Sequence, residues 1–315
     1  MVHLIDFHSH YFEAAWFSSQ SPPGSGVLAR AWPLLTNIEA QLAEMDRAGI
    51  NAKVLSAPSA TLATPGQPLH SDLIRRINDR FAELVALYPE RLLALATIDA
   101  FQGEAAAREV ERAIQTLGLG GICVDCAQAD RYLDVPEARP TLEAAASLGV
   151  AIFVHPVSPA GLTERLAHLG HTGILLARGT ENAASLLALL RSGIFDELSN
   201  LKIVLPMIGV AALLFAGIAD QDYGREDGWQ GPTLPSIARQ RLHVDTMGFD
   251  PAAIRFAIEL LGPEHVLVGS DWPIMPITPR QRVEETLAQL DLTDDQKVAI
   301  MGGNTLRLLR QHPTW

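Results

Sequence analysis

The stretch LHVDTMGFDPAAIRFAIELLGPEHVLVGSDWP, residues 242–273, contains the pattern that decides the fold. An apolar run of strand length, 242–246, is followed by an amphipathic segment, 251–261, and by a second apolar run, 265–270. Gly262 supplies a stop signal where the helix should end. A strand, a helix and another strand in this order predict a unit of parallel sheet with a crossover helix.

The same alternation recurs along all 315 residues. It predicts strands at Val2–Phe7, Ala52–Ser56, Leu92–Ile98, Gly121–Asp125, Ala151–His155, Lys202–Pro206, Leu242–Thr246 and His265–Ser270. Helices are expected at Asn37–Ala48, Ser71–Tyr88, Glu104–Leu117, Pro136–Ser147, Ala183–Asp196, Ala211–Ala219, Pro251–Leu261, Pro279–Leu290 and Thr293–Leu309. Eight such units favour an α/β fold, a single (β/α)8 TIM barrel over 1–315. An open Rossmann sheet is disfavoured because the first strand lacks a following GxGxxG motif.

Three long stretches that follow predicted strands show neither a strand pattern nor a helix pattern: 11–36, 157–182 and 220–239. We expect irregular loops there. Barrel active sites are built from the loops that follow the strands, so these stretches should contain substrate contacts.

Composition limits the classes of function. The formal net charge of −12 argues against a nucleic-acid or anionic-membrane surface, and 48% hydrophobic against 19% charged residues allows a large core. The N-terminal segment does not resemble a signal peptide, and the apolar run 204–219 is broken by Pro206. We therefore expect a cytoplasmic enzyme that acts on a small molecule, without nucleic acid or membrane partners.

Cys123 and Cys126 form a CxxC pair, a spacing that metal and redox sites also use. Such sites usually need a second ligand pair or a thioredoxin-like context, and the sequence offers neither. Two cysteines are also too few for a disulfide framework. We expect both thiols to be structural.

The first predicted strand leads into DFHSH, residues 6–10. Residues two apart point to the same face of a strand, so His8 and His10 can both point into the mouth of the barrel. Two imidazoles on one face make half of a zinc-type site. The alternative is a surface pair of histidines after a buried strand.

Two more polar residues occur where predicted strands end. His155 ends the fifth strand and Asp271 follows the eighth. A histidine at the end of a fully apolar strand is either a core residue or a ligand. An aspartate at that position is costly to bury unless it binds a metal or is otherwise paired. Three imidazoles and one carboxylate at the same end of one barrel predict a metal site.

The sequence resembles the amidohydrolase-related barrels typified by aminocarboxymuconate-semialdehyde decarboxylase. The resemblance covers nearly the whole chain. It is carried by DFHSHY at 6–11, YLDVPEARPTLEAAASLGVAIFVHP at 132–156, SGIFDELSNLKIVL at 192–205, residues 242–273 and GGNTLRLL at 302–309.

The resemblance implies roles for four residues. His8, His10 and His155 match the family's metal-ligating histidines. Asp271 matches the aspartate that contacts the metal and takes a proton from the water that the metal activates. Asp271 and His155 are thus the expected catalytic residues, and the expected cofactor is a divalent ion, zinc first and manganese as the alternative.

Met207 departs from the family pattern, because it stands where the resemblance places a histidine after the sixth strand. A thioether can neither move a proton nor polarise a substrate. The chemistry either does not need that histidine, uses another group, or is lost. Candidate replacements are His243, which shares a strand face with Asp245, and His168 and His171 in the stretch 157–182.

The expected substrate-binding residues are Trp272, Met207 and Arg178. Trp272 could pack against a ring-shaped substrate or could only seal the rim of the barrel. Met207 is expected to shape an apolar part of the pocket wall. Arg178 is a candidate to hold a substrate carboxylate, as are Arg131 and Arg225, because the planar guanidinium suits that task.

These features favour a hydrolase that cleaves an amide, lactone or activated C–C bond of a small cyclic or aromatic carbonyl compound. Metal-activated water with Asp271 as base is sufficient to attack a carbonyl. Non-oxidative decarboxylation of an aromatic or unsaturated carboxylic acid is the first alternative. That reaction depends more on the histidine that Met207 replaces, because in the family this histidine helps to deliver a proton to the substrate carbon. The second alternative is a catalytically impaired metal- or ligand-binding barrel. A homo-oligomer, dimer or tetramer, is also expected.

Overall fold

A sheet of eight parallel strands forms the centre of the computed structural model, which describes residues 3–19, 26–223 and 233–309. In sheet order these strands are β1 (Ile5–His10), β2 (Ala52–Ser56), β3 (Leu92–Thr97), β4 (Gly121–Asp125), β7 (Ala151–His155), β8 (Lys202–Leu205), β9 (Leu242–Asp245) and β10 (Val266–Leu267). The amide of Phe7 donates to the carbonyl of Val268 at 2.8 Å, and the amide of Asp271 donates to that of His8 at 2.8 Å. These bonds join the last strand to the first, so the predicted barrel is confirmed.

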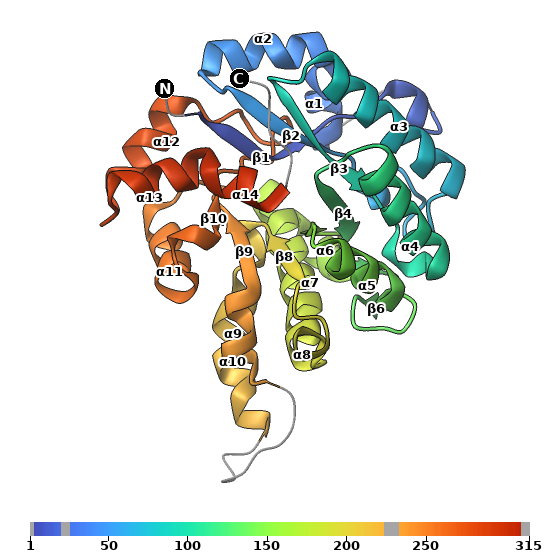
Figure 1. Ribbon diagram of the computed structural model, residues 1–315, viewed down its shortest axis with the longest axis vertical. Helices are drawn as coiled ribbons and strands as arrows, with labels where there is room; N and C mark the ends of the chain where they lie inside the picture. Colours follow the sequence, from blue (N-terminus) through green and yellow to red (C-terminus); the bar gives the residue numbers. More distant parts are fainter. Residues whose placement is uncertain (1–2, 20–25, 224–232, 310–315) are drawn as a thin grey trace.

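Helices surround the strands (Figure 1). They are α1 (Gly26–Leu35), α2 (Ile38–Ala48), α3 (Ser71–Leu87), α4 (Glu104–Glu111), α5 (Arg139–Leu148), α6 (Leu162–Leu166), α7 (His171–Arg191), α8 (Ile194–Glu197), α9 (Ala211–Ala219), α10 (Pro235–Ala238), α11 (Pro251–Leu261), α12 (Arg280–Leu287), α13 (Asp294–Val298) and α14 (Asn304–Leu309). A small hairpin of β5 (Ala127–Gln128) and β6 (Arg131–Tyr132) follows β4. None of the helices in the described ranges is long and apolar enough to cross a membrane.

Most predicted elements occur within a few residues of their expected bounds, and β2, β4, β7, α9 and α11 match them fully. Local signals explain the agreement. The side chain of Asn37 accepts a hydrogen bond from the amide of Ala40 and so caps α2, while Gly49 ends that helix with φ 72°.

The prediction of an irregular segment at 157–182 is wrong, because α7 begins at His171. Gly173 and Gly179 disfavour a helix by local propensity. In the structure they allow close packing instead. A Cβ at Gly173 would lie 2.0 Å from the carbonyl oxygen of Leu166, and one at Gly179 would lie 2.3 Å from that of Ile208. Tertiary contact therefore overrides propensity here. The helix α1 likewise occupies part of 11–36.

The strands separate two apolar layers. The inner one fills the barrel below its mouth and includes Ile5, Phe7, Val54, Leu95, Cys123, Phe153 and Val204. The outer one lies between strands and helices and includes Cys126. Both cysteines are buried and free, and burial raises the pKa of each thiol. This burial is as expected for cysteines with a structural role.

Candidate metal centre

An irregularity in β1 turns both of its histidines toward the barrel axis. Pairing of β1 with β2 shifts register between Asp6 and Ser9. Phe7 and His8, although adjacent, both contact the inward ring of Phe153, with centroid distances of 5.4 and 4.8 Å. This is the behaviour of a β-bulge, which re-aims side chains next to functional sites. The strand also continues through His10, whereas the prediction ended it at Phe7.

Three imidazoles and one carboxylate meet at the mouth of the barrel. His8, His10 and His155 each offer a ligand atom, and these atoms lie within 4.8 Å of one another. Asp271 Oδ1 lies 3.0 Å from His10 Nε2 and 3.5 Å from His8 Nε2. The structure thus brings together the four residues that the sequence analysis singled out, and all four are buried.

Hydrogen bonds to the other ring nitrogens orient two of the histidines. His8 Nδ1 lies 2.6 Å from Asp245 Oδ2, and His10 Nδ1 lies 2.9 Å from Ser56 Oγ. Both Nε2 atoms therefore face Asp271. Metal-binding histidines usually have such a partner on the ring nitrogen that does not bind the ion.

The site fits a divalent ion. His8 Nε2 is buried and has no hydrogen-bond partner among the described residues. A buried polar atom without a partner is costly, and coordination would remove that cost. Three imidazole nitrogens and a carboxylate oxygen are a donor set that zinc prefers, and other divalent transition metals accept it.

The protonation states also suit ligands. Burial lowers the pKa of His10, and burial followed by the charge of Arg178 lowers that of His155 well below its usual value. Burial raises the pKa of Asp271, but the hydrogen bond with His10 and the nearby positive charges outweigh it, so that pKa is lowered. These shifts favour neutral His10 and His155 and an ionised Asp271, the forms that bind a metal. Asp245, by contrast, raises the pKa of His8 against the effect of burial.

The backbone around Asp271 is closely constrained. Asp271 has φ 63°, a left-handed conformation that costs energy for a residue with a Cβ. A Cβ at Gly269 would lie 2.8 Å from the Cβ atoms of both His8 and Asp245, so only glycine fits there. Strain of this kind is typical of functional sites and places the carboxylate over the imidazoles.

A cavity of about 560 Å³ opens beside the four residues. His10, His155 and Asp271 line one end of it, while Phe12, Leu28, Ile174, Leu175 and Ile274 contribute apolar surface. Its charged residues, apart from Asp271, are Asp99, Asp125, Arg178 and Glu181. The volume and the mixture of apolar wall with few charges are typical of a small-molecule site.

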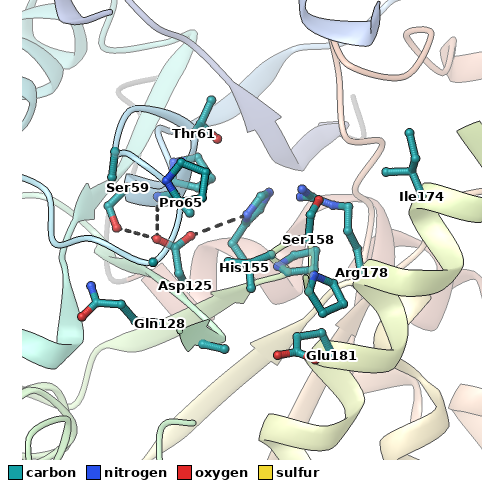
Figure 2. A pocket seen from close by; sticks show the side chains of 18 of the residues that line it. Ser59, Thr61, Pro65, Asp125, Gln128, His155, Ser158, Ile174, Arg178 and Glu181 are labelled. Carbon is teal, nitrogen blue, oxygen red and sulfur yellow. Dashed lines mark hydrogen bonds and ion pairs between the residues drawn. The ribbon is translucent and has the colours of Figure 1, made fainter. Parts of the chain in front are cut away.

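Arg178 lies on the face of α7 that forms one wall of this cavity. Figure 2 shows its guanidinium and the ring of His155 extending into the same space. Arg178 forms no ion pair with any residue that the structure describes, although its charge acts on His155, Asp125 and Asp271. An unpaired guanidinium facing a cavity is suited to binding a carboxylate.

Asp125 is a site residue that the sequence analysis missed. It is the last residue of β4 and pairs directly with His155, the last residue of β7. Its side chain is buried against the cavity, and burial raises its pKa to about 6. The sequence does contain a signal for this residue, because Asp125 ends a predicted strand just as His155 does.

Trp272 and Met207 do not line the cavity in the described part of the chain, contrary to the prediction for both. Trp272 is 2% exposed and belongs to the outer apolar layer, and the centroid of its ring lies 4.8 Å from Lys53 Nζ. The Met207 side chain is buried in the outer apolar layer. The orientation of each depends on how its strand end turns, which strand periodicity does not specify.

Asp245 acts as a fixed hydrogen-bond acceptor. Oδ2 is paired with His8, and Oδ1 accepts from the amides of Met207 at 2.8 Å and Met247 at 2.9 Å. Methionine in place of histidine at position 207 thus keeps the hydrogen bond from the backbone amide to Asp245, since every residue except proline has an amide N–H that can donate.

The candidate replacements for the missing histidine have different locations. His243 packs against His265, with ring centroids 4.5 Å apart, at the end of the barrel opposite the cavity. Burial lowers its pKa to about 3. His168 is exposed and contacts Arg165 instead of the cavity. His171 does line the cavity.

Of the other two candidate arginines, only Arg131 lies in the described part of the chain. Arg131 donates to Gln128 Oε1 at 2.5 Å and lies 5.3 Å from the ring of Phe101, but it is not one of the residues that line the cavity. Arg225 lies outside the described residues.

Comparison with known proteins finds decarboxylases among the relatives of this chain. The chain is 29% identical to a gamma-resorcylate decarboxylase from Rhizobium sp. (strain MTP-10005), over 88% of each chain. It is 25% identical to the 2-amino-3-carboxymuconate-6-semialdehyde decarboxylase of Dictyostelium discoideum, over 87% of this chain and 77% of that protein. The solved structure of a 2,6-dihydroxybenzoate decarboxylase complexed with 2,6-dihydroxybenzoate has a TM-score of 0.82 and 25% identity, covering 98% of this chain and 100% of the other.

The family assignment rests on the full length of the barrel. The model of the amidohydrolase family matches residues 5–311, from β1 to just beyond α14. This range contains His8, His10, His155 and Asp271. The resemblance stated from the sequence is therefore confirmed, and the chain belongs to the amidohydrolase family of enzymes.

Proposed function

We propose that this protein is a metal-dependent decarboxylase that removes CO2 from an aromatic or unsaturated carboxylic acid without oxidation. The observation that carries the proposal is the position of Arg178, whose guanidinium has no ion-pair partner among the described residues and faces the same cavity as the imidazole cluster. The relatives named above are decarboxylases of carboxylic acids, so they support this alternative better than the hydrolase favoured by the sequence.

His8, His10, His155 and Asp271 would hold the divalent ion. Zinc is the first choice for this donor set and manganese the second. When bound, the ion would supply positive charge that attracts a substrate oxygen and stabilises negative charge developing on the substrate. The side chains of the protein do the remaining work of binding, orientation and proton transfer.

Arg178 would bind the carboxylate or another anionic oxygen of the substrate. Asp99, Asp125 and Glu181 line the same cavity and would repel an acid placed elsewhere. The apolar side chains of Phe12, Ile174 and other wall residues are suited to a planar ring. Charge and shape together would therefore fix how an aromatic acid lies in the cavity.

Asp271 is the proposed proton-transfer residue: as an ionised carboxylate it would first take a proton from water and then deliver that proton to the substrate carbon. Decarboxylation leaves an electron pair on the substrate carbon, and that carbon must take up a proton. Met207 cannot donate one, and its side chain lies outside the cavity. Asp271 both lines the cavity and contacts two imidazoles of the cluster, which places it at the reacting end.

Hydrolysis is the second candidate function, and the methionine at position 207 favours it. Attack of water on a carbonyl needs a base such as Asp271 but no protonation of a carbon atom. A catalytically impaired barrel is the third candidate, which the same methionine would explain.

A substrate panel distinguishes these candidates. The protein would be loaded with Zn2+ or Mn2+ and offered hydroxybenzoates, lactones and N-acyl aromatics in D2O. We expect CO2 release from at least one hydroxybenzoate, with one deuterium at the carbon that carried the carboxylate. Cleavage of lactones or amides without any CO2 release would contradict the proposal and favour hydrolysis. Inactivity toward the panel despite metal binding would favour impairment.

Self-association belongs to the same proposal. The side chains of Leu214, Phe215, Ile218 and Ile237 are exposed on α9 and α10, which project away from the barrel (Figure 1). Monomers rarely expose large side chains of this kind close together. Sedimentation analysis should detect a dimer or tetramer, and Phe215→Glu should shift it toward monomer. A monomer at every concentration would contradict this part of the proposal.

A further inference from the structure

The three histidines of the cluster differ in one respect. The Nδ1 atoms of His8 and His10 have partners at 2.6 and 2.9 Å, in Asp245 and Ser56. The Nδ1 atom of His155 is buried and has no hydrogen-bond partner among the described residues. Of the three rings, only that of His155 therefore lacks a hydrogen bond at Nδ1 that would fix its orientation.

A matching acceptor lies close to that nitrogen. Asp125 Oδ1 is 3.9 Å from His155 Nδ1, and it too is buried without a hydrogen-bond partner in the described residues. One atom can donate and the other can accept. A shift of about 1 Å would convert the gap into an ordinary hydrogen bond.

The rest of Asp125 is already held in place. It pairs with His155 across the ladder of β4 and β7. Its other oxygen, Oδ2, accepts from the hydroxyl of Ser59 and from the amide of Ala60 at 2.7 Å. Figure 2 shows these contacts on one side of the carboxylate and His155 on the other. The carboxylate is therefore fixed with Oδ1 directed at the imidazole.

We propose that Asp125 is a positioning residue that accepts a hydrogen bond from His155 Nδ1 and thereby presents Nε2 to the divalent ion. The inference rests on the proposed metal site. A histidine whose Nδ1–H is bonded must keep Nε2 free of hydrogen, which is the form that binds a metal. Asp125 would thus do for His155 what Asp245 does for His8.

The other acids of the cavity do not serve this purpose. Glu181 lies on α7 and is hydrogen-bonded to the hydroxyl of Tyr132 at 3.4 Å. Asp99 accepts from the amides of Leu69 and Phe101 and from the side-chain amides of Gln102 and Gln128. Neither forms an ion pair with His155 within the described ranges.

Metal affinity tests the inference in the absence of any substrate. The dissociation constant for Zn2+ would be measured by competition with a chelator for wild type, Asp125→Ala, Asp125→Asn and Glu181→Gln. We expect Asp125→Ala to bind about 10- to 100-fold more weakly, the usual loss on removing such a partner. Asp125→Asn keeps a neutral acceptor and should lose less. Glu181→Gln removes one negative charge from the same cavity and should change affinity less than threefold.

Histidine NMR of the zinc-loaded protein supplies a second measurement, since Asp125→Ala also frees Ser59 and could destabilise the fold. In wild type we expect His155 to carry its proton on Nδ1, with a slowly exchanging signal that shifts in Asp125→Asn. An Nε2–H form of His155, or undiminished zinc affinity in a folded Asp125→Ala, would overturn the role of Asp125. If wild type binds no divalent ion at all, the proposed metal site itself fails.

Discussion

The two sides of the barrel mouth differ in how completely their polar atoms are paired. On the side of β1, β9 and β10, His8 is hydrogen-bonded to Asp245 and His10 to Asp271, and His8 Nε2 lies 3.5 Å from Asp271 without a hydrogen bond among the described residues. On the side of β4, β7 and α7, His155 Nδ1 and Asp125 Oδ1 have no hydrogen-bond partner in the described part of the chain, and Arg178 forms no ion pair there. This contrast indicates that the first side is a preformed scaffold for a metal ion. On the second side, a bound ion or substrate would supply the partners that the polar atoms lack. Precise sites are usually built on rigid elements whose side chains are oriented by hydrogen bonds, as His8 and His10 are.

Removing the scaffold should have the largest effect. We expect the double variant His8→Ala, His10→Ala to lose its divalent ion and all activity, because two of the four donors disappear. Metal analysis of the purified protein would measure the loss, and circular dichroism would check that the barrel remains folded. Undiminished metal content in a folded variant would contradict the proposed ligand set.

The substitution Asp271→Asn should have the second-largest effect on activity. The substitution keeps the size of the side chain and one acceptor oxygen but removes the carboxylate that is proposed to transfer the proton. We expect kcat to fall by about two orders of magnitude or more, in line with the loss of a general acid or base. Substrate affinity should change little, as measured by inhibitor binding. A rate within a few-fold of wild type would mean that another group moves the proton.

Arg178 tests the ligand-binding side. Arg178→Met keeps the length and apolar character of the side chain but removes the charge, so kcat/KM for an acid substrate should fall about 10- to 100-fold, the value of one charge-assisted hydrogen bond. The fall should appear mainly in KM. The matched variant Arg178→Lys should recover part of it, because it restores the charge without the planar fork. Equal kinetics in all three proteins would remove Arg178 from the substrate site.

Met207→His should have the smallest effect on the reaction. The side chain at this position is buried outside the cavity, so a histidine there would lack a partner and would destabilise the fold by about 1–3 kcal/mol. We expect a lower melting temperature and a kcat/KM within about threefold of wild type. A tenfold rise in decarboxylation would show instead that residue 207 reaches the substrate.

Much of this arrangement could be predicted from the sequence, because it depends on local pattern. The strands follow from apolar runs, and the carboxyl ends of parallel strands meet at one edge, which is why His8, His10, His155 and Asp271 converge. Recognition of the family added their roles.

The remainder depends on contacts between distant parts of the chain. Asp245 lies 237 residues from His8, and no local pattern selects it as the partner of that ring. The wall that carries Arg178 required α7 to continue through two glycines, which only tertiary packing favours. Trp272 and Met207 turned away from the cavity because the backbone at each strand end departs from regular strand geometry.

The central claim is that an ion held by the imidazole cluster is required for decarboxylation. The most direct measurement is a titration of metal-free protein with Zn2+ or Mn2+, followed by release of labelled CO2 from the carboxylate of a hydroxybenzoate that the panel identifies as a substrate. We predict no release without metal and a linear rise that ends at one ion per chain. Full CO2 release from thoroughly metal-free protein would contradict the claim.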